Sequence, residues 1–155
     1  EFHSFSKTYN MTGWRIGWAC GNSKLVAALA KVKTNFDSGI FQAIQVAGVT
    51  ALRTKEEEIE DLRRMYQERR DLLINGLRGV GWKIPPPKAA FYVWARLPKG
   101  YTSSMETAAR FLQEANVVVT PGIGFGEAGE GFIRMTITMP KDRLSEAIDR
   151  LSKIL

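Results

Sequence analysis

The sequence is poor in the residues that would suggest a disulfide scaffold, a metal site or a membrane anchor. It has one cysteine and one histidine among 155 residues. Cys20 cannot form a disulfide within the chain, which fits a reducing compartment, and we expect a cytoplasmic protein. His3 cannot form a metal site with Cys20 alone, so we predict a structural role for it and no metal ligands. No apolar run reaches the roughly 20 residues of a membrane span, so no membrane partner is expected.

The charge balance is basic but ordinary in composition. Lys and Arg number 22 against 16 Asp and Glu, giving a net charge of +6, with 45% apolar and 25% charged residues. This composition excludes a disordered tail and a collagen-like chain. Both signs alternate along the predicted helix that starts at residue 54, which indicates a solvated surface. We therefore predict no nucleic-acid partner; a basic nucleic-acid binder would show a salt-dependent affinity for DNA.

The sequence opens inside an apparent strand, with no initiator methionine and no basic-then-apolar leader. We therefore expect a piece of a longer protein. The alternation of apolar and polar residues predicts strands over 2–6, 14–20, 90–97, 117–119 and 132–138. Helical spacing and capping signals predict helices over 23–35, 38–52, 54 to 75–78, 103–113 and from 140 onward. The helix beginning at Thr54 is the expected joint between two structural units.

The most informative segment is residues 4–17, SFSKTYNMTGWRIG. Lys7 follows a strand, Ser4 and Ser6 precede it, and Arg15 lies eight positions after it. A lysine amine forms a Schiff base with a carbonyl, whereas an arginine fork and serine hydroxyls suit phosphate oxygens. Together these groups suit a phosphorylated aldehyde cofactor. The alternative is an exposed loop lysine with a surface arginine.

This segment resembles the pyridoxal-phosphate lysine motif of class I aminotransferases. The resemblance implies an α/β fold, namely the C-terminal portion of a fold-type I pyridoxal-phosphate transferase. Residues 1–53 would end the large cofactor domain, and residues 54–155 would form the small α+β domain. It implies pyridoxal 5′-phosphate as cofactor, amino-acid and 2-oxo-acid substrates, and a homodimer. Lys7 would form the Schiff base, and Ser4 and Arg15 would bind the phosphate with help from Ser6.

A second candidate site lies in the predicted strand 132–138. Alternation places Arg134 opposite the apolar face of this strand, where it needs an anion or an acidic partner. By the resemblance, Arg134 binds the substrate α-carboxylate; the alternative is an arginine that reaches solvent or pairs with a glutamate. Phe91 resembles a family aromatic that approaches the substrate, although an aromatic there is more often part of a core. The glycines of 122–126 lack the context of a nucleotide loop and suit a sharp turn.

The substrate is less well defined by the sequence. Residues 35–45 and 121–131 are similar to the LL-diaminopimelate aminotransferases of lysine biosynthesis, while aspartate and alanine aminotransferases remain open. Asp37 and Ser38 either lie near a neighbouring subunit's site or form a loop and helix N-cap. The family's other cofactor ligands would precede Glu1, so we expect the piece alone to be inactive. A catalytically empty interaction domain is the alternative from another class.

Overall fold

The computed structural model describes residues 1–155. Contacts divide the chain into two compact units, Glu1–Asp61 and Leu62–Leu155, which are described separately below. The division falls within helix α4, Glu56–Gly79, which the capping signals at Thr54 predicted as one long helix. The predicted domain boundary between residues 53 and 54 stays a prediction.

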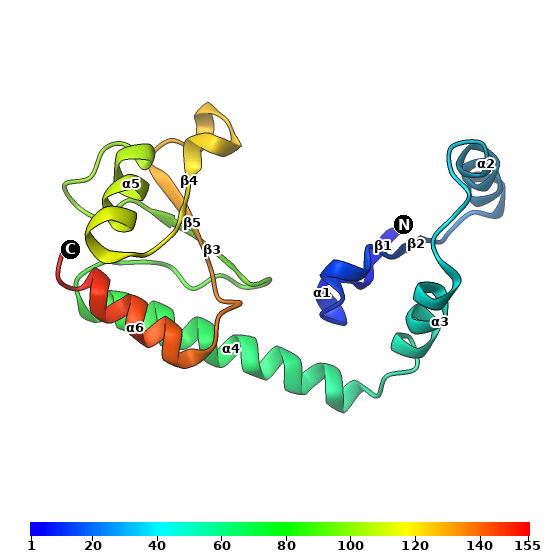
Figure 1. Cartoon of the computed structure of the whole chain (residues 1–155), viewed down its shortest axis with the longest axis horizontal. Coiled ribbons are helices and arrows are strands. Elements are labelled where there is room, and N and C mark those ends of the chain that lie inside the picture. Colours follow the sequence, from blue (N-terminus) through cyan, green and yellow to red (C-terminus); the bar gives the residue numbers. More distant parts are fainter. The chain divides into compact units, whose positions relative to one another are not determined.

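The first unit begins with a short antiparallel hairpin of β1, Phe2–Ser4, and β2, Gly17–Ala19 (Figure 1). The connection contains the single-turn helix α1, Phe5–Thr8, and the 3₁₀ turn η1, Thr12–Trp14. Gly17 is required at its position, because a Cβ there would lie 2.5 Å from the carbonyl oxygen of His3. Both strands are shorter than predicted. The chain turns into α1 after Ser4, and β2 begins only after η1 and the left-handed backbone of Arg15.

Two helices complete the first unit. Helix α2, Ser23–Thr34, begins at the predicted place, and the side chain of Asn22 accepts hydrogen bonds from the first turn as its N-cap. Helix α3, Gln42–Ala51, begins later than predicted, and its N-cap position is Phe41. Of the alternative that residues 37–39 form a loop and helix N-cap, the loop is confirmed and the N-cap is wrong. The side chain of Asp37 instead accepts the backbone N–H of Gly39 at 2.7 Å, which forms a turn ahead of the helix.

The second unit contains a three-stranded antiparallel sheet in the order β3–β5–β4 (Figure 1). The strands are β3, Tyr92–Arg96, β4, Thr120–Pro121, and β5, Phe132–Thr136. The predicted strand over 117–119 is wrong, and Val118 is 81% exposed. The N–H of Val117 donates to the carbonyl of Phe111, so this segment serves as the exit from the preceding helix.

Helices pack around this sheet to form the core. Helix α5, Ser104–Ala115, has the predicted Ser103 N-cap, and α6, Lys141–Leu151, follows Pro140 as expected. Helices α4 and α6 pack closely at Gly76. A Cβ at this position would lie only 2.6 Å from the Cδ1 of Ile148. The largest fully buried apolar side chains of the unit are Phe111, Ile74, Leu77, Ile84, Ile133, Ile137, Leu151 and Val93. No helix of the chain combines the length and the apolar character needed to cross a membrane.

Candidate active site

The hairpin of the first unit brings the ends of the lysine segment together. Ser4 pairs with Gly17 across the two strands, and the N–H of Phe5 donates to the carbonyl of Ile16 at 3.2 Å. The residues just before Lys7 therefore lie beside the residues just after Arg15. The structure thus places the backbone of the four predicted cofactor-binding residues, Ser4, Ser6, Lys7 and Arg15, within one hairpin and its connection.

Ser4 is the last residue of β1 and directly precedes the helical turn α1. The Oγ of Ser4 accepts the N–H of Ser6 at 3.1 Å and caps α1. A hydroxyl that accepts a hydrogen bond keeps its own O–H, which can donate to a phosphate oxygen. Lys7 lies in α1 with its side chain exposed, whereas Ser6 is 7% exposed and its carbonyl accepts the hydroxyl of Thr12 at 2.9 Å.

Arg15 has an unusual backbone conformation, with φ of 53° in the left-handed region. Such a conformation costs a non-glycine residue roughly 1–2 kcal/mol. The side chain turns back so that Nη1 donates to the carbonyl of Thr12 at 3.0 Å. Arg15 makes no ion pair, so its positive charge is not neutralised within the chain. An amine, a hydroxyl and a guanidinium on one turn structure fit an aldehyde that carries a phosphate.

Arg134 occupies the central strand of the sheet in the second unit. It pairs with Trp94 of β3 and lies on the face opposite the buried Ile133 and Met135, as the alternation predicted. Its guanidinium carbon lies 4.4 Å from the ring centroid of Tyr92 and 4.6 Å from that of Phe125. The alternative that Arg134 pairs with a glutamate is wrong, because Arg134 makes no ion pair within the chain. The side chain therefore suits an external anion.

Phe91 lies just before β3 and is half-buried against the core of the second unit. Its ring contacts those of Tyr66 and Tyr92, with centroids 5.6 and 4.9 Å away. The predicted contact between Phe91 and a substrate stays a prediction. Sequence reasoning missed the two rings that touch Arg134. Alternation along β3 carried a signal for Tyr92, whereas nothing local in the sequence connects Phe125 with Arg134.

The first unit also contains a cavity of about 430 Å³ between the hairpin and α3. None of the predicted cofactor-binding residues lines it. Its lining residues are Phe5, Ile16, Gly17, Trp18, Lys33, Gly39, Ile40, Gln45, Gly48 and Val49. Phe5, Ile16 and Gly17 belong to the lysine segment, so the cavity adjoins this segment but is not lined by its predicted cofactor-binding residues.

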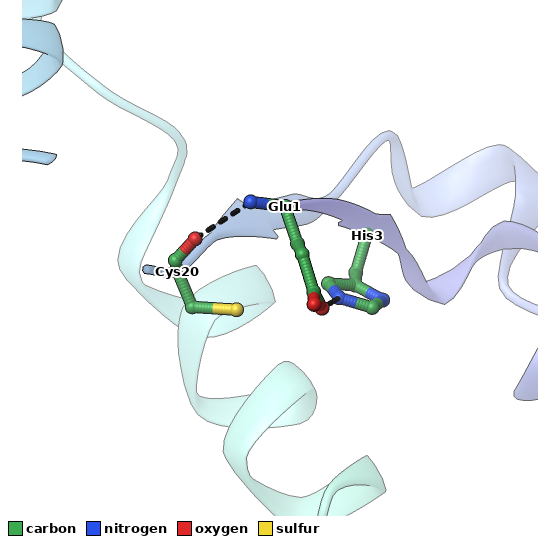
Figure 2. A group of neighbouring side chains, drawn as sticks. All are labelled: Glu1, His3 and Cys20. Carbon is green, nitrogen blue, oxygen red and sulfur yellow. Dashed lines mark hydrogen bonds and ion pairs between the residues drawn. The ribbon is translucent and has the colours of Figure 1, made fainter. Parts of the chain in front are cut away.

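The histidine and the cysteine lie together on the surface of the hairpin, joined by Glu1 (Figure 2). The Nε2 of His3 is 2.9 Å from a carboxylate oxygen of Glu1, and its ring stacks on Trp18 at a centroid distance of 5.0 Å. Potential ligand atoms of Glu1, His3 and Cys20 lie within 4.8 Å of one another. The structural role of His3 and the absence of a metal ligand both stay predictions.

Comparisons with known proteins show the family of the chain. The chain belongs to the aminotransferase class I and II family, whose model matches residues 2–151. The predicted resemblance and the fold class, the C-terminal portion of such an enzyme, are therefore confirmed.

Among curated relatives, the LL-diaminopimelate aminotransferase of Moorella thermoacetica is 52% identical over 155 residues, covering all of this chain and 40% of the relative. That of Maridesulfovibrio salexigens is 54% identical over 154 residues, covering 99% of this chain and 39% of the relative. The chain thus spans about 40% of the length of the relatives that it matches.

Solved structures are likewise similar to this chain over about 40% of their own length. Substrate-bound BacF from Bacillus subtilis has a TM-score of 0.93 and 37% identity, covering 99% of this chain and 39% of that one. The aromatic aminotransferase of Pyrococcus horikoshii has a TM-score of 0.90 and 33% identity, covering 99% of this chain and 42% of that one.

Proposed function

We propose that the intact protein is a pyridoxal-phosphate-dependent LL-diaminopimelate aminotransferase that transfers an amino group between an amino acid and a 2-oxo acid. The observation that carries this proposal is the identity of 49–54% along essentially the whole chain with relatives of that name. An aspartate or alanine aminotransferase is the second candidate, because class I and II aminotransferases share the family model.

The lysine segment holds the cofactor in this proposal. Arg15 and Ser4 bind the phosphate, Ser6 supports the turn from its buried position, and the amine of Lys7 faces the carbonyl end. When bound, pyridoxal phosphate supplies an aldehyde and an electron-withdrawing ring next to the substrate α-carbon. The amine of Lys7 would remove the proton from the α-carbon of the amino donor and, in the other half-reaction, deliver a proton to the α-carbon of the 2-oxo acid, which is a general acid–base role.

Arg134 binds the α-carboxylate of the substrate in this proposal. Its guanidinium presents a planar set of N–H donors that matches both oxygens of a carboxylate. No acidic side chain competes for these donors, because Arg134 makes no ion pair within the chain. We further propose a cytoplasmic homodimer, with Phe91 approaching the substrate and with Asp37 and Ser38 near the site of the neighbouring subunit.

The test is an assay of amino transfer by the intact protein with LL-diaminopimelate, aspartate or alanine as the donor. The proposal expects LL-diaminopimelate to give the highest kcat/KM. It also expects Lys7→Ala to lose nearly all turnover, while Lys24→Ala, at an exposed position in α2, keeps it. A higher kcat/KM with aspartate or alanine favours the second candidate, and normal turnover of Lys7→Ala contradicts the role of Lys7.

A further inference from the structure

The side chain of Arg134 is held in place without using its hydrogen-bond donors. It makes neither an ion pair nor a side-chain hydrogen bond within the chain, and it is half-buried. Its contacts are the two aromatic rings, at 4.4 Å for Tyr92 and 4.6 Å for Phe125. A cation–π contact does not take up the N–H groups as hydrogen-bond donors to oxygen. The edge of Arg134 is therefore available for a ligand.

The two rings come from different parts of the second unit. Trp94 of β3 is the strand partner of Arg134, so the two side chains lie on the same face of the sheet. Tyr92 lies two residues before Trp94 and therefore shares this face with Arg134. Phe125 ends the 3₁₀ turn η2, Gly122–Phe125, which follows β4. The ring of Phe125 also meets Trp94 edge to face, with centroids 5.4 Å apart. Trp94 is thus an internal reporter of the position of Phe125.

The loop that carries Phe125 is fastened to the first residue of α5. The carboxylate of Glu130 accepts the N–H of Ser104 at 2.6 Å and the hydroxyl of Ser104 at 2.9 Å. The same hydroxyl accepts the N–H of Ile123 at 3.3 Å. A Cβ on Gly122 would lie 1.9 Å from the carbonyl oxygen of Gly129, so the two sides of the loop are in close contact. These contacts fix the place from which Phe125 reaches Arg134.

We propose that Tyr92 and Phe125 are positioning residues that orient the guanidinium of Arg134 so that its N–H edge receives a carboxylate. Ser104 and Glu130 hold the loop of Phe125 for this purpose. The inference rests on the proposed function, since it takes Arg134 as the carboxylate-binding residue. It adds that the orientation of Arg134 is set by aromatic contacts, whereas an acidic partner would occupy the donors that the substrate needs.

The experiment uses the full chain and acetate as the probe, with chloride replaced by acetate at constant ionic strength. The side-chain N–H signal of Arg134 and the indole N–H signal of Trp94 are followed by NMR. Wild type is expected to show saturable shifts of both signals. Phe125→Leu and Tyr92→Leu are expected to weaken acetate binding by about two- to fivefold and to speed rotation of the guanidinium. Tyr92→Phe, which keeps the ring, should recover most of the affinity lost in Tyr92→Leu.

Two further variants separate the inference from the proposed function. Arg96→Ala removes an equal charge from the neighbouring strand β3, at a residue whose guanidinium carbon lies 5.4 Å from the ring centroid of Phe132 and which makes no ion pair. This variant should leave acetate binding unchanged. Arg134→Ala should abolish the saturable shift. Retained binding in Arg134→Ala contradicts the carboxylate role itself. Loss in Arg134→Ala together with wild-type affinity and slow guanidinium rotation in Phe125→Leu contradicts the positioning role alone. Unchanged backbone N–H signals of the core confirm that each variant is folded.

Discussion

The two units of the chain differ in how much apolar surface they enclose. In the second unit, Leu77 and Phe111 are fully buried, whereas in the first unit Leu25 is 72% and Val32 is 63% exposed. Burial of one such side chain contributes about 1.5–3 kcal/mol, so the first unit lacks much of the stabilisation that the second has. Helix α2 has only 12 residues, a length that is marginal without packing.

This difference separates the settings of the two candidate residues. Arg134 lies on a sheet backed by a closed core, whereas Lys7 belongs to a unit whose apolar helix faces remain open. The chain spans about 40% of the length of its relatives. We therefore expect the remainder of the intact protein to cover α2 and α3 and to stabilise the lysine segment.

The largest expected difference concerns hydrogen exchange in the full chain. Backbone N–H groups of Val93 and Ile133 should exchange at least roughly a thousandfold more slowly than those of α2. The reason is that the N–H groups of the core exchange only when the second unit unfolds. Exchange monitored by NMR or mass spectrometry measures this ratio. Equal protection in the two units would remove the distinction between them.

Truncation of one leucine in each unit sharpens the comparison. Leu77→Ala removes a fully buried side chain and should lower the free energy of unfolding of the second unit by about 2–5 kcal/mol. Leu25→Ala, at an exposed position, should change the free energy of unfolding of the first unit by less than about 0.5 kcal/mol. Urea denaturation followed by fluorescence measures both values. A cost at Leu25 that approached the cost at Leu77 would show that the first unit has a core of its own.

The helix caps offer a matched pair with a smaller effect. Ser103 accepts the N–H of Glu106 at 3.3 Å, and Asn22 accepts that of Lys24 at 3.0 Å. Ser103→Ala should destabilise the second unit by about 1 kcal/mol. Asn22→Ala should reduce the helix signal in circular dichroism while the unfolding midpoint of the second unit stays the same. A common shift of that midpoint would indicate a single cooperative unit.

The smallest effect concerns acid. The backbone N–H of Ser104, with that of Gly131, lowers the pKa of the Glu130 carboxyl below its ordinary value of about 4.3. The stabilisation is therefore complete above that value and is lost as the pH falls through the lowered pKa. Glu130→Gln should remove this part of the acid dependence, as measured by unfolding midpoints between roughly pH 3 and 6. Identical pH profiles for wild type and Glu130→Gln would disprove the assignment.

Much of the second unit could be predicted from the sequence, because its signals are local. The Ser103 cap fixes the start of α5, and alternation along β5 separates Arg134 from the buried Ile133. The failure at 117–119 has a physical cause, since three valines favour a strand but the end of α5 uses the N–H of Val117. In the first unit, the Oγ of Ser4 accepts the N–H of Ser6 and caps α1, so β1 ends at Ser4.

The candidate site was predictable to the extent that it is encoded in consecutive residues. The spacing of Ser4, Lys7 and Arg15 pointed to a candidate cofactor segment, and the hairpin pairing places the ends of that segment side by side. The ring of Phe125 could not be connected with Arg134 in advance. That contact depends on the loop joined by Glu130 and Ser104, which lie 26 positions apart in the sequence.

The most direct test of the central claim is the absorbance spectrum of the intact protein titrated with pyridoxal phosphate, for wild type and for Lys7→Ala. The account predicts the absorbance of a protein-bound imine in wild type, altered by addition of an amino donor, and no such absorbance in Lys7→Ala. The same imine absorbance in Lys7→Ala, or none in wild type, would contradict the assignment of Lys7.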